Sequence, residues 1–164
     1  MPVENPVAST QSDGRWRITD VPSGANALSV AILNGGTSVP LTYSFTPSGF
    51  NWTTTQATVA DPRLTLIQDL SRPGKITETL ELTYVASSDP TSAAVLLTAG
   101  KAGQFNVRSG IDNAVNFATT QKASVITYVL GVQRPVPPTE NGVDLISQTA
   151  YITSQTVRNG TLVA

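Results

Sequence analysis

The chain has 164 residues, of which 40% are hydrophobic and 13% are charged, and its net charge is -1. It contains no histidine and no cysteine, the side chains that most often act as acid–base catalysts, activated nucleophiles or zinc, copper and haem ligands. Its lysines and arginines are scattered, whereas tight nucleic-acid binders cluster them to neutralise phosphates. We therefore expect no catalytic residues, no metal, no cofactor and no tight binding of DNA or RNA.

The length fits a single domain over residues 1–164, long enough to bury a sizeable core. Residues 1–14 are polar and small, which predicts a flexible N-terminal arm. The N-terminus shows no basic segment followed by an apolar one, and no apolar run approaches the length that spans a bilayer. We expect synthesis in the cytoplasm and no membrane partner.

The first half of the chain predicts short strands followed by a long loop. Residues 15–19 alternate and residues 27–33 are rich in apolar side chains, so each predicts a strand. From 34 to 62 the chain is dominated by turn residues and by the threonine run 53–55, with alternation only at 41–45. This segment is predicted to be mostly loop, and long loops inside compact domains are usually functional.

The strongest local pattern predicts a β-hairpin over residues 63–85, turning at Arg72-Pro73-Gly74. Pairing Ser71 with Lys75 gathers most apolar side chains on one face, and a slip of one residue would mix the two faces. We expect the apolar face to cover a core and the polar face to meet water or a channel. The polar face includes Thr65, Asp69, Thr77, Thr79, Glu81 and Thr83.

One helix is predicted at about residues 90–99, with Ser88 or Asp89 as its cap, Pro90 at its first position and Gly100 at its end. Further strands and a short C-terminal arm are predicted at 104–108, 123–133, 145–157 and 158–164. The predicted fold class is mainly β: a β-sandwich or barrel with a long hairpin and one flanking α-helix.

A two-carboxylate glycosidase is the main enzyme class that a chain without histidine and cysteine leaves open. Glu78 and Glu81 point to opposite faces of a strand. Asp69 and Glu81 share a face, but solvated strand carboxylates explain them better. The sequence has no phosphate-binding loop, dinucleotide motif or nucleophile elbow, so we expect no enzyme.

The order of the predicted elements resembles the major tail protein, or tail tube protein, of long-tailed bacteriophages. The stretch 75–85, which leads into Ser88-Asp89-Pro90 and the apolar helix, carries most of this resemblance. The resemblance implies a homo-oligomer in which rings of six copies stack into a tube. It implies assembly in the virion tail after synthesis in the host bacterial cytoplasm, with tape measure, tail terminator and distal tail proteins as partners. Double-stranded DNA would pass the lumen without specific binding.

By the same resemblance, the polar hairpin face lines the lumen, where a neutral or acidic wall does not trap phosphates. The loop at 34–62 and both terminal arms would join neighbouring subunits and rings. The expected contact residues are Val3, Val7, Phe50, Asn51, Trp52, Thr53, Leu162 and Val163. The alternatives are a tail terminator or injection-tube relative, and a non-catalytic β-sandwich binding module such as a virion decoration or carbohydrate/receptor-binding domain.

Overall fold

The computed structural model describes residues 9, 11–63, 67–68 and 70–164. In this part of the chain the structure is mainly β, with two four-residue helices, which confirms the predicted class. The residues divide into two compact units. Unit 1 comprises the described parts of Met1–Ser44, Ala102–Tyr128 and Thr153–Ala164, and unit 2 comprises those of Phe45–Lys101 and Val129–Ile152. A single domain over 1–164 stays a prediction.

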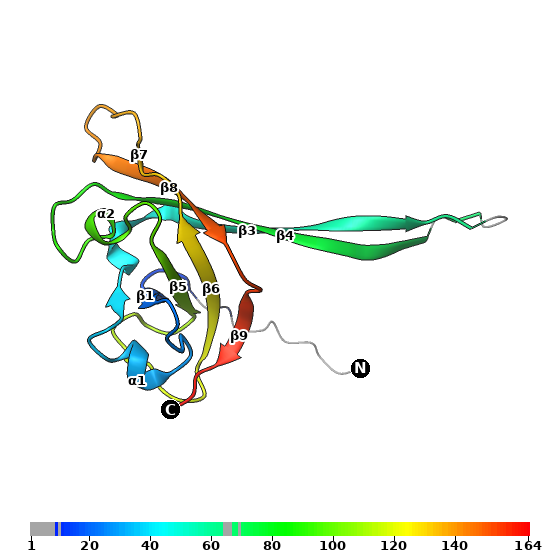
Figure 1. Cartoon of the computed structure of the whole chain (residues 1–164), viewed down its shortest axis with the longest axis horizontal. Coiled ribbons are helices and arrows are strands. Elements are labelled where there is room, and N and C mark those ends of the chain that lie inside the picture. Colours follow the sequence, from blue (N-terminus) through cyan, green and yellow to red (C-terminus); the bar gives the residue numbers. More distant parts are fainter. Residues whose placement is uncertain (1–8, 10, 64–66, 69) are drawn as a thin grey trace. The chain divides into compact units, whose positions relative to one another are not determined.

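Unit 1 contains strands in the order β2-β1-β5-β6, with β9 paired to β6 (Figure 1). Its elements are β1 (Trp16–Pro22), α1 (Val30–Leu33), β2 (Val39–Pro40), the 3-10 turn η1 (Thr42–Ser44), β5 (Ala102–Ser109), β6 (Lys122–Leu130) and β9 (Val157–Thr161). Strand β6 continues from unit 1 into unit 2. The core of unit 1 is apolar and includes Val21, Ala27, Leu33, Phe117, Ala123, Val125 and Leu162.

The strand predicted at residues 27–33 is wrong, because this segment contains helix α1. The Asn26 side chain accepts a hydrogen bond from the Leu28 backbone at 3.1 Å, and the Leu33 backbone N–H donates to the Ser29 carbonyl at 3.0 Å. The Leu33 side chain is then buried in the core. The local turn at Asn26 and the packing of Leu33 in the core together override the β propensity of this apolar run.

Unit 2 contains the strand order β8-β4-β3, with β7 paired to β8. Its elements are β3 (Phe45–Asp61), β4 (Leu70–Val85), α2 (Ala93–Leu96), β7 (Arg134–Pro135) and β8 (Leu145–Ile152). Strands β3 and β4 form a long antiparallel hairpin, whose length is plain in Figure 1. Strand β8 pairs with only one end of β4, from Leu80 to Val85. We call the β3–β4 part beyond that pairing, residues 53–61 and 70–79, the outer ribbon.

The predicted long hairpin exists, but its arms differ from the prediction. Residues 45–61 are strand, so the loop predicted at 34–62 is wrong over that range. The Arg72-Pro73-Gly74 segment lies inside β4 and is not a turn. A register shift between Gln56 and Thr58 lies opposite it. Proline is tolerated at such an irregularity, on a strand whose other edge is not paired.

The predicted helix at about 90–99 is confirmed only at its centre, as the four-residue helix α2. Before it, the Asp89 carboxylate accepts hydrogen bonds from the Thr91 backbone at 2.8 Å and the Thr91 hydroxyl at 2.6 Å. This side-chain turn competes with the helical bonding pattern and so delays the start of the helix. Gly100 follows the helix with φ +79, a left-handed conformation that suits glycine.

Candidate assembly surface

One face of β4 carries the polar residues that the sequence groups together. Thr77, Thr79, Glu81 and Thr83 alternate along the strand and therefore share a face. The first three are exposed and Thr83 is half-buried. On the other face Leu80, Leu82 and Tyr84 are fully buried. The predicted alternation is confirmed here, whereas Thr65 and Asp69 lie outside the described residues.

Side-chain hydrogen bonds connect this polar face across strands β3, β4, β8 and β7. The hydroxyl oxygens of Thr53 and Thr79 lie 2.6 Å apart. The Thr149 hydroxyl on β8 lies 3.0 and 3.1 Å from the two carboxylate oxygens of Glu81 and accepts a 3.3 Å bond from the Arg134 guanidinium. The face is thus a ladder of hydroxyls with one fixed carboxylate. Lys75 lies on the same face by alternation, and Arg134 reaches the face through Thr149.

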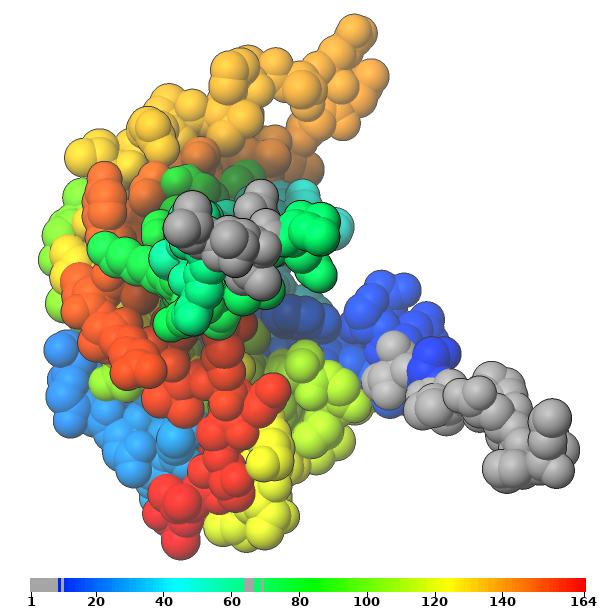
Figure 2. All heavy atoms as spheres, turned by 90° about the vertical axis from the view of Figure 1, so that its right-hand side faces the viewer, coloured from blue at the N-terminus to red at the C-terminus, as the bar shows by residue number. Residues whose placement is uncertain are grey.

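Strand β3 is the outermost strand in the order β8-β4-β3. Residues 45–60 contain no charged side chain, and residues 53–60 are all exposed. Natural sheets usually protect such edges with lysine, proline or a covering element, because open backbone groups invite pairing with another chain. Figure 2 views β3 and β4 along their length, from the end at which they join. This long uncharged edge is typical of a surface that another chain covers.

The outer ribbon also exposes apolar side chains. Ile76 is 55% exposed, Val59 52% and Leu70 42%. They are too few to form a core of their own, and a two-stranded ribbon is only marginally stable alone in water. Their presence on one ribbon makes the ribbon a candidate contact surface.

The residues predicted to contact neighbouring copies lie in different environments. Asn51 pairs with Glu81 and Thr53 with Thr79, so these two predicted contact residues share the face predicted to line the lumen. Phe50 is half-buried, with its ring 5.5 Å from that of Phe45. Trp52 is half-buried opposite Leu80.

The terminal contact residues behave differently from the prediction. Leu162 is only 1% exposed and belongs to the unit 1 core, so the prediction that it contacts a neighbour is wrong. The Leu162 backbone N–H donates to the Gln121 carbonyl at 2.8 Å, which fixes this segment in place. Val163 keeps 48% of its surface exposed and remains available. Val3 and Val7 lie outside the described residues.

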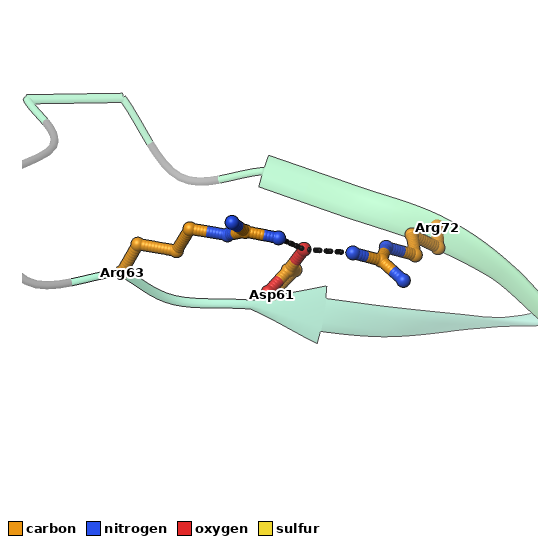
Figure 3. Close-up of polar contacts among 3 residues, drawn as sticks. All are labelled: Asp61, Arg63 and Arg72. Carbon is orange, nitrogen blue, oxygen red and sulfur yellow. Dashed lines mark hydrogen bonds and ion pairs between the residues drawn. The ribbon is translucent and has the colours of Figure 1, made fainter.

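Sequence reasoning missed one charged cluster at the far end of the outer ribbon, shown in Figure 3. The Asp61 carboxylate accepts bonds from Arg63 at 3.1 Å and from Arg72 at 2.6 Å. Asp61 and Arg72 come together only because β3 pairs with β4. The sequence alone gives no signal for this cluster until that pairing is known.

The perturbed groups of the described residues have structural causes. Burial raises the pKa of Tyr84, whose hydroxyl donates to the buried Gln148 side chain at 2.9 Å. Hydrogen bonds from Thr91 lower the pKa of Asp89. The described residues hold no group of three or more acidic, histidine or cysteine side chains that could bind a metal ion. Within the same residues, no helix is long and apolar enough to cross a membrane.

The chain is mainly β and has a long exposed hairpin with a polar strand face and an uncharged edge. The family model of the phage tail tube protein matches residues 3–164. The chain therefore belongs to the phage tail tube protein family and is a structural tail protein, which confirms the resemblance seen in the sequence.

A solved structure supports the fold. The chain is similar to a chain of the anti-feeding prophage (AFP) baseplate, seen by cryo-electron microscopy with six-fold symmetrisation. The TM-score is 0.55 at 8% sequence identity, and the match covers 95% of this chain and 98% of that one. At this identity the likeness concerns the fold alone. The comparison with curated proteins gives no match.

Proposed function

We propose that this protein forms the wall of a phage tail tube, in which six copies make a ring, rings stack, and the genome passes through the lumen. The observation that carries the proposal is the β3–β4 hairpin, which has an uncharged edge, a polar face and no covering element of its own unit over its outer part. Membership of the tail tube family supports it.

The polar face of β4 is the proposed lumen surface. Thr77, Thr79, Glu81 and Thr83 would line it, and Thr65 and Asp69 stay proposed members. Hydroxyls stay hydrated without binding phosphate strongly, and a carboxylate repels it. Such a wall lets double-stranded DNA slide past, whereas a row of lysines would hold it.

The uncharged edge of β3 and the exposed apolar side chains of the outer ribbon are the proposed contacts between copies. Phe50, Asn51, Trp52 and Thr53 lie along this edge, and Val163, Val3 and Val7 would add contacts from the two ends of the chain. Tape measure, tail terminator and distal tail proteins are the proposed further partners. The protein would be made in the host bacterial cytoplasm and reside in the virion.

Negative-stain microscopy of the purified protein over a range of concentrations tests the proposal. Hollow tubes or six-fold rings are expected as the concentration rises, because each copy exposes a surface that only another copy covers. A species that stays monomeric at every concentration and salt level contradicts the proposal.

A further inference from the structure

At the far end of the outer ribbon, two arginines, Arg72 within it and Arg63 just after it, contact a single carboxylate. Asp61 bridges Arg63 and Arg72 through the same oxygen, as Figure 3 shows. The two arginine side chains remain 58% and 65% exposed, whereas that of Asp61 is 24% exposed. The partly buried Asp61 carboxylate thus holds two exposed guanidinium groups close together. Because two arginines share one aspartate, the cluster is positively charged.

Most of the hydrogen-bonding capacity of this pair is unused. A guanidinium carries five N–H donors in a planar fork, and each arginine bonds Asp61 through one nitrogen. The described residues supply no second acceptor to either group. Paired, exposed guanidinium groups bind carboxylates in a bidentate manner with defined geometry. The cluster can therefore donate hydrogen bonds to a further carboxylate.

Unit 2 also carries an exposed acidic segment that matches this need. Glu140 and Asp144 lie in the exposed stretch 137–144 between β7 and β8, and the described residues give their carboxylates no partner. The stretch is anchored, because the Ala86 backbone N–H donates to the Asp144 carbonyl at 2.8 Å. We call residues 137–144 the acidic loop.

The two charged sites lie at opposite ends of the same unit. The acidic loop adjoins Val85, since Val85 pairs with Leu145, whereas Arg72 lies near the other end of β4. At about 3.3 Å per residue, the thirteen-residue step from 72 to 85 spans roughly 40 Å. Figure 1 shows the hairpin pointing away from the loop between β7 and β8. The arginine pair of one copy therefore cannot reach the acidic loop of the same copy.

We propose that the Arg63–Arg72 pair receives the acidic loop, through Glu140 and Asp144, of a second copy of this chain. Because the basic site and the acidic site lie at opposite ends of one unit, the contact is head-to-tail, the kind that joins copies into a closed ring or an open stack. The inference rests on the proposed function and deepens it by naming the two surfaces that join copies.

Two charge-reversed proteins test this pairing. The first carries Arg63→Glu with Arg72→Glu, and the second carries Glu140→Arg with Asp144→Arg. Each alone presents like charges at both sites, so each is expected to lose self-association. Their one-to-one mixture restores opposite charges at every contact, because the basic hairpin of one meets the acidic loop of the other and the reverse. Sedimentation velocity is expected to show association in the mixture only, weakening as salt rises.

A matched control carries Arg15→Glu with Lys122→Glu, which makes the same change in net charge as the first variant at two exposed sites of unit 1. It is expected to associate like the wild type. Circular dichroism confirms that each variant folds before it is mixed. Normal self-association of the first variant, or a mixture that stays dissociated, overturns the inference. Neither result bears on whether the wild type forms tubes, so failure of the proposed function is read separately from the wild-type micrographs.

Discussion

The two ends of β4 show what one continuous strand does in two settings. From Leu80 to Val85 the strand pairs with β3 on one side and β8 on the other, and Leu80, Leu82 and Tyr84 are fully buried. In the outer ribbon it pairs with β3 alone, and Ile76 is 55% exposed. The pairing with β3 continues at both ends, but only the inner end also pairs with β8 and contributes to a core. The inner end should set the stability of the monomer, and the outer end should set its association.

The largest expected effect concerns Gly49, which lies beside Thr83 at the inner end of β4. A Cβ atom added at Gly49 would lie 1.9 Å from the Thr83 carbonyl oxygen, inside the irregularity between Phe45 and Phe50. The backbone must move to admit it, so Gly49→Ala should lower the free energy of unfolding by about 3 kcal/mol or more. Urea denaturation measures the change.

Gly36→Ala is the matched control, because nothing lies within 4 Å of a Cβ at Gly36. This substitution should change the free energy of unfolding by at most about 1 kcal/mol. Equal effects of the two substitutions would show that β3 does not approach β4 at Gly49 as described.

Two apolar side chains of β4, one at each end of the strand, should contribute differently to the free energy of unfolding. Leu82→Ala removes a fully buried side chain and should lower the free energy of unfolding by about 2–5 kcal/mol. Ile76→Ala, in the outer ribbon, should change it by less than about 0.5 kcal/mol while weakening association. Denaturant unfolding at a concentration where the protein is monomeric measures both, and similar losses would remove the distinction between the two ends.

Unit 1 contains a buried polar pair, Tyr128 and Asp20, whose effect on stability can be compared with that of the apolar side chains of β4. The Tyr128 hydroxyl donates to the buried Asp20 carboxylate, and burial, followed by the charge of Asp20, raises the pKa of Tyr128. Tyr128→Phe leaves Asp20 without this donor and should cost about 1–3 kcal/mol of unfolding free energy.

The same pair gives a pH dependence. A raised folded-state pKa keeps the Tyr128 hydroxyl protonated when unfolded tyrosine, with a pKa of about 10, already ionises. Its contribution to stability is complete below about pH 10 and is lost as the pH rises above it. Denaturation of the wild type and Tyr128→Phe between pH 8 and 11 tests this, and parallel curves would contradict it.

The smallest expected effect is stabilising. Thr120 is a β-branched residue with φ +75, in the left-handed region that such residues rarely adopt. Asparagine tolerates this conformation, so Thr120→Asn should raise the free energy of unfolding by up to about 1 kcal/mol. Thermal unfolding followed by circular dichroism measures the shift, and a lower melting temperature would mean that the Thr120 side chain makes a compensating contact.

Part of the fold could be predicted from the sequence, because a strand with one buried face alternates between apolar and polar residues. The alternation from Thr77 to Tyr84 reports which face of β4 meets the core, whichever strand is its partner. For the same reason it could not identify that partner. Residues 53–60 of β3 are exposed on both faces, so no alternation distinguishes them from a loop. Pro73 and Gly74 then suggested a turn inside β4.

The candidate contacts were harder to predict because they depend on pairing between distant segments. The Asp61–Arg72 contact exists only once β3 and β4 are aligned. Leu162 follows an Asn-Gly pair that suggested a free arm, but its side chain fills the core of unit 1. Short segments have little periodicity, so sequence alone does not separate a docked end from a free one.

Hydrogen exchange of the backbone amides, measured in the dilute monomer and in the concentrated assembly, tests most directly whether other copies hold the outer ribbon. Amides at 80–85 should be protected in both samples, because they belong to the core of unit 2. Amides at 53–61 and 70–77 should exchange readily in the monomer and become protected on assembly. Equal exchange of the outer ribbon in both samples would contradict its role as the surface that joins copies.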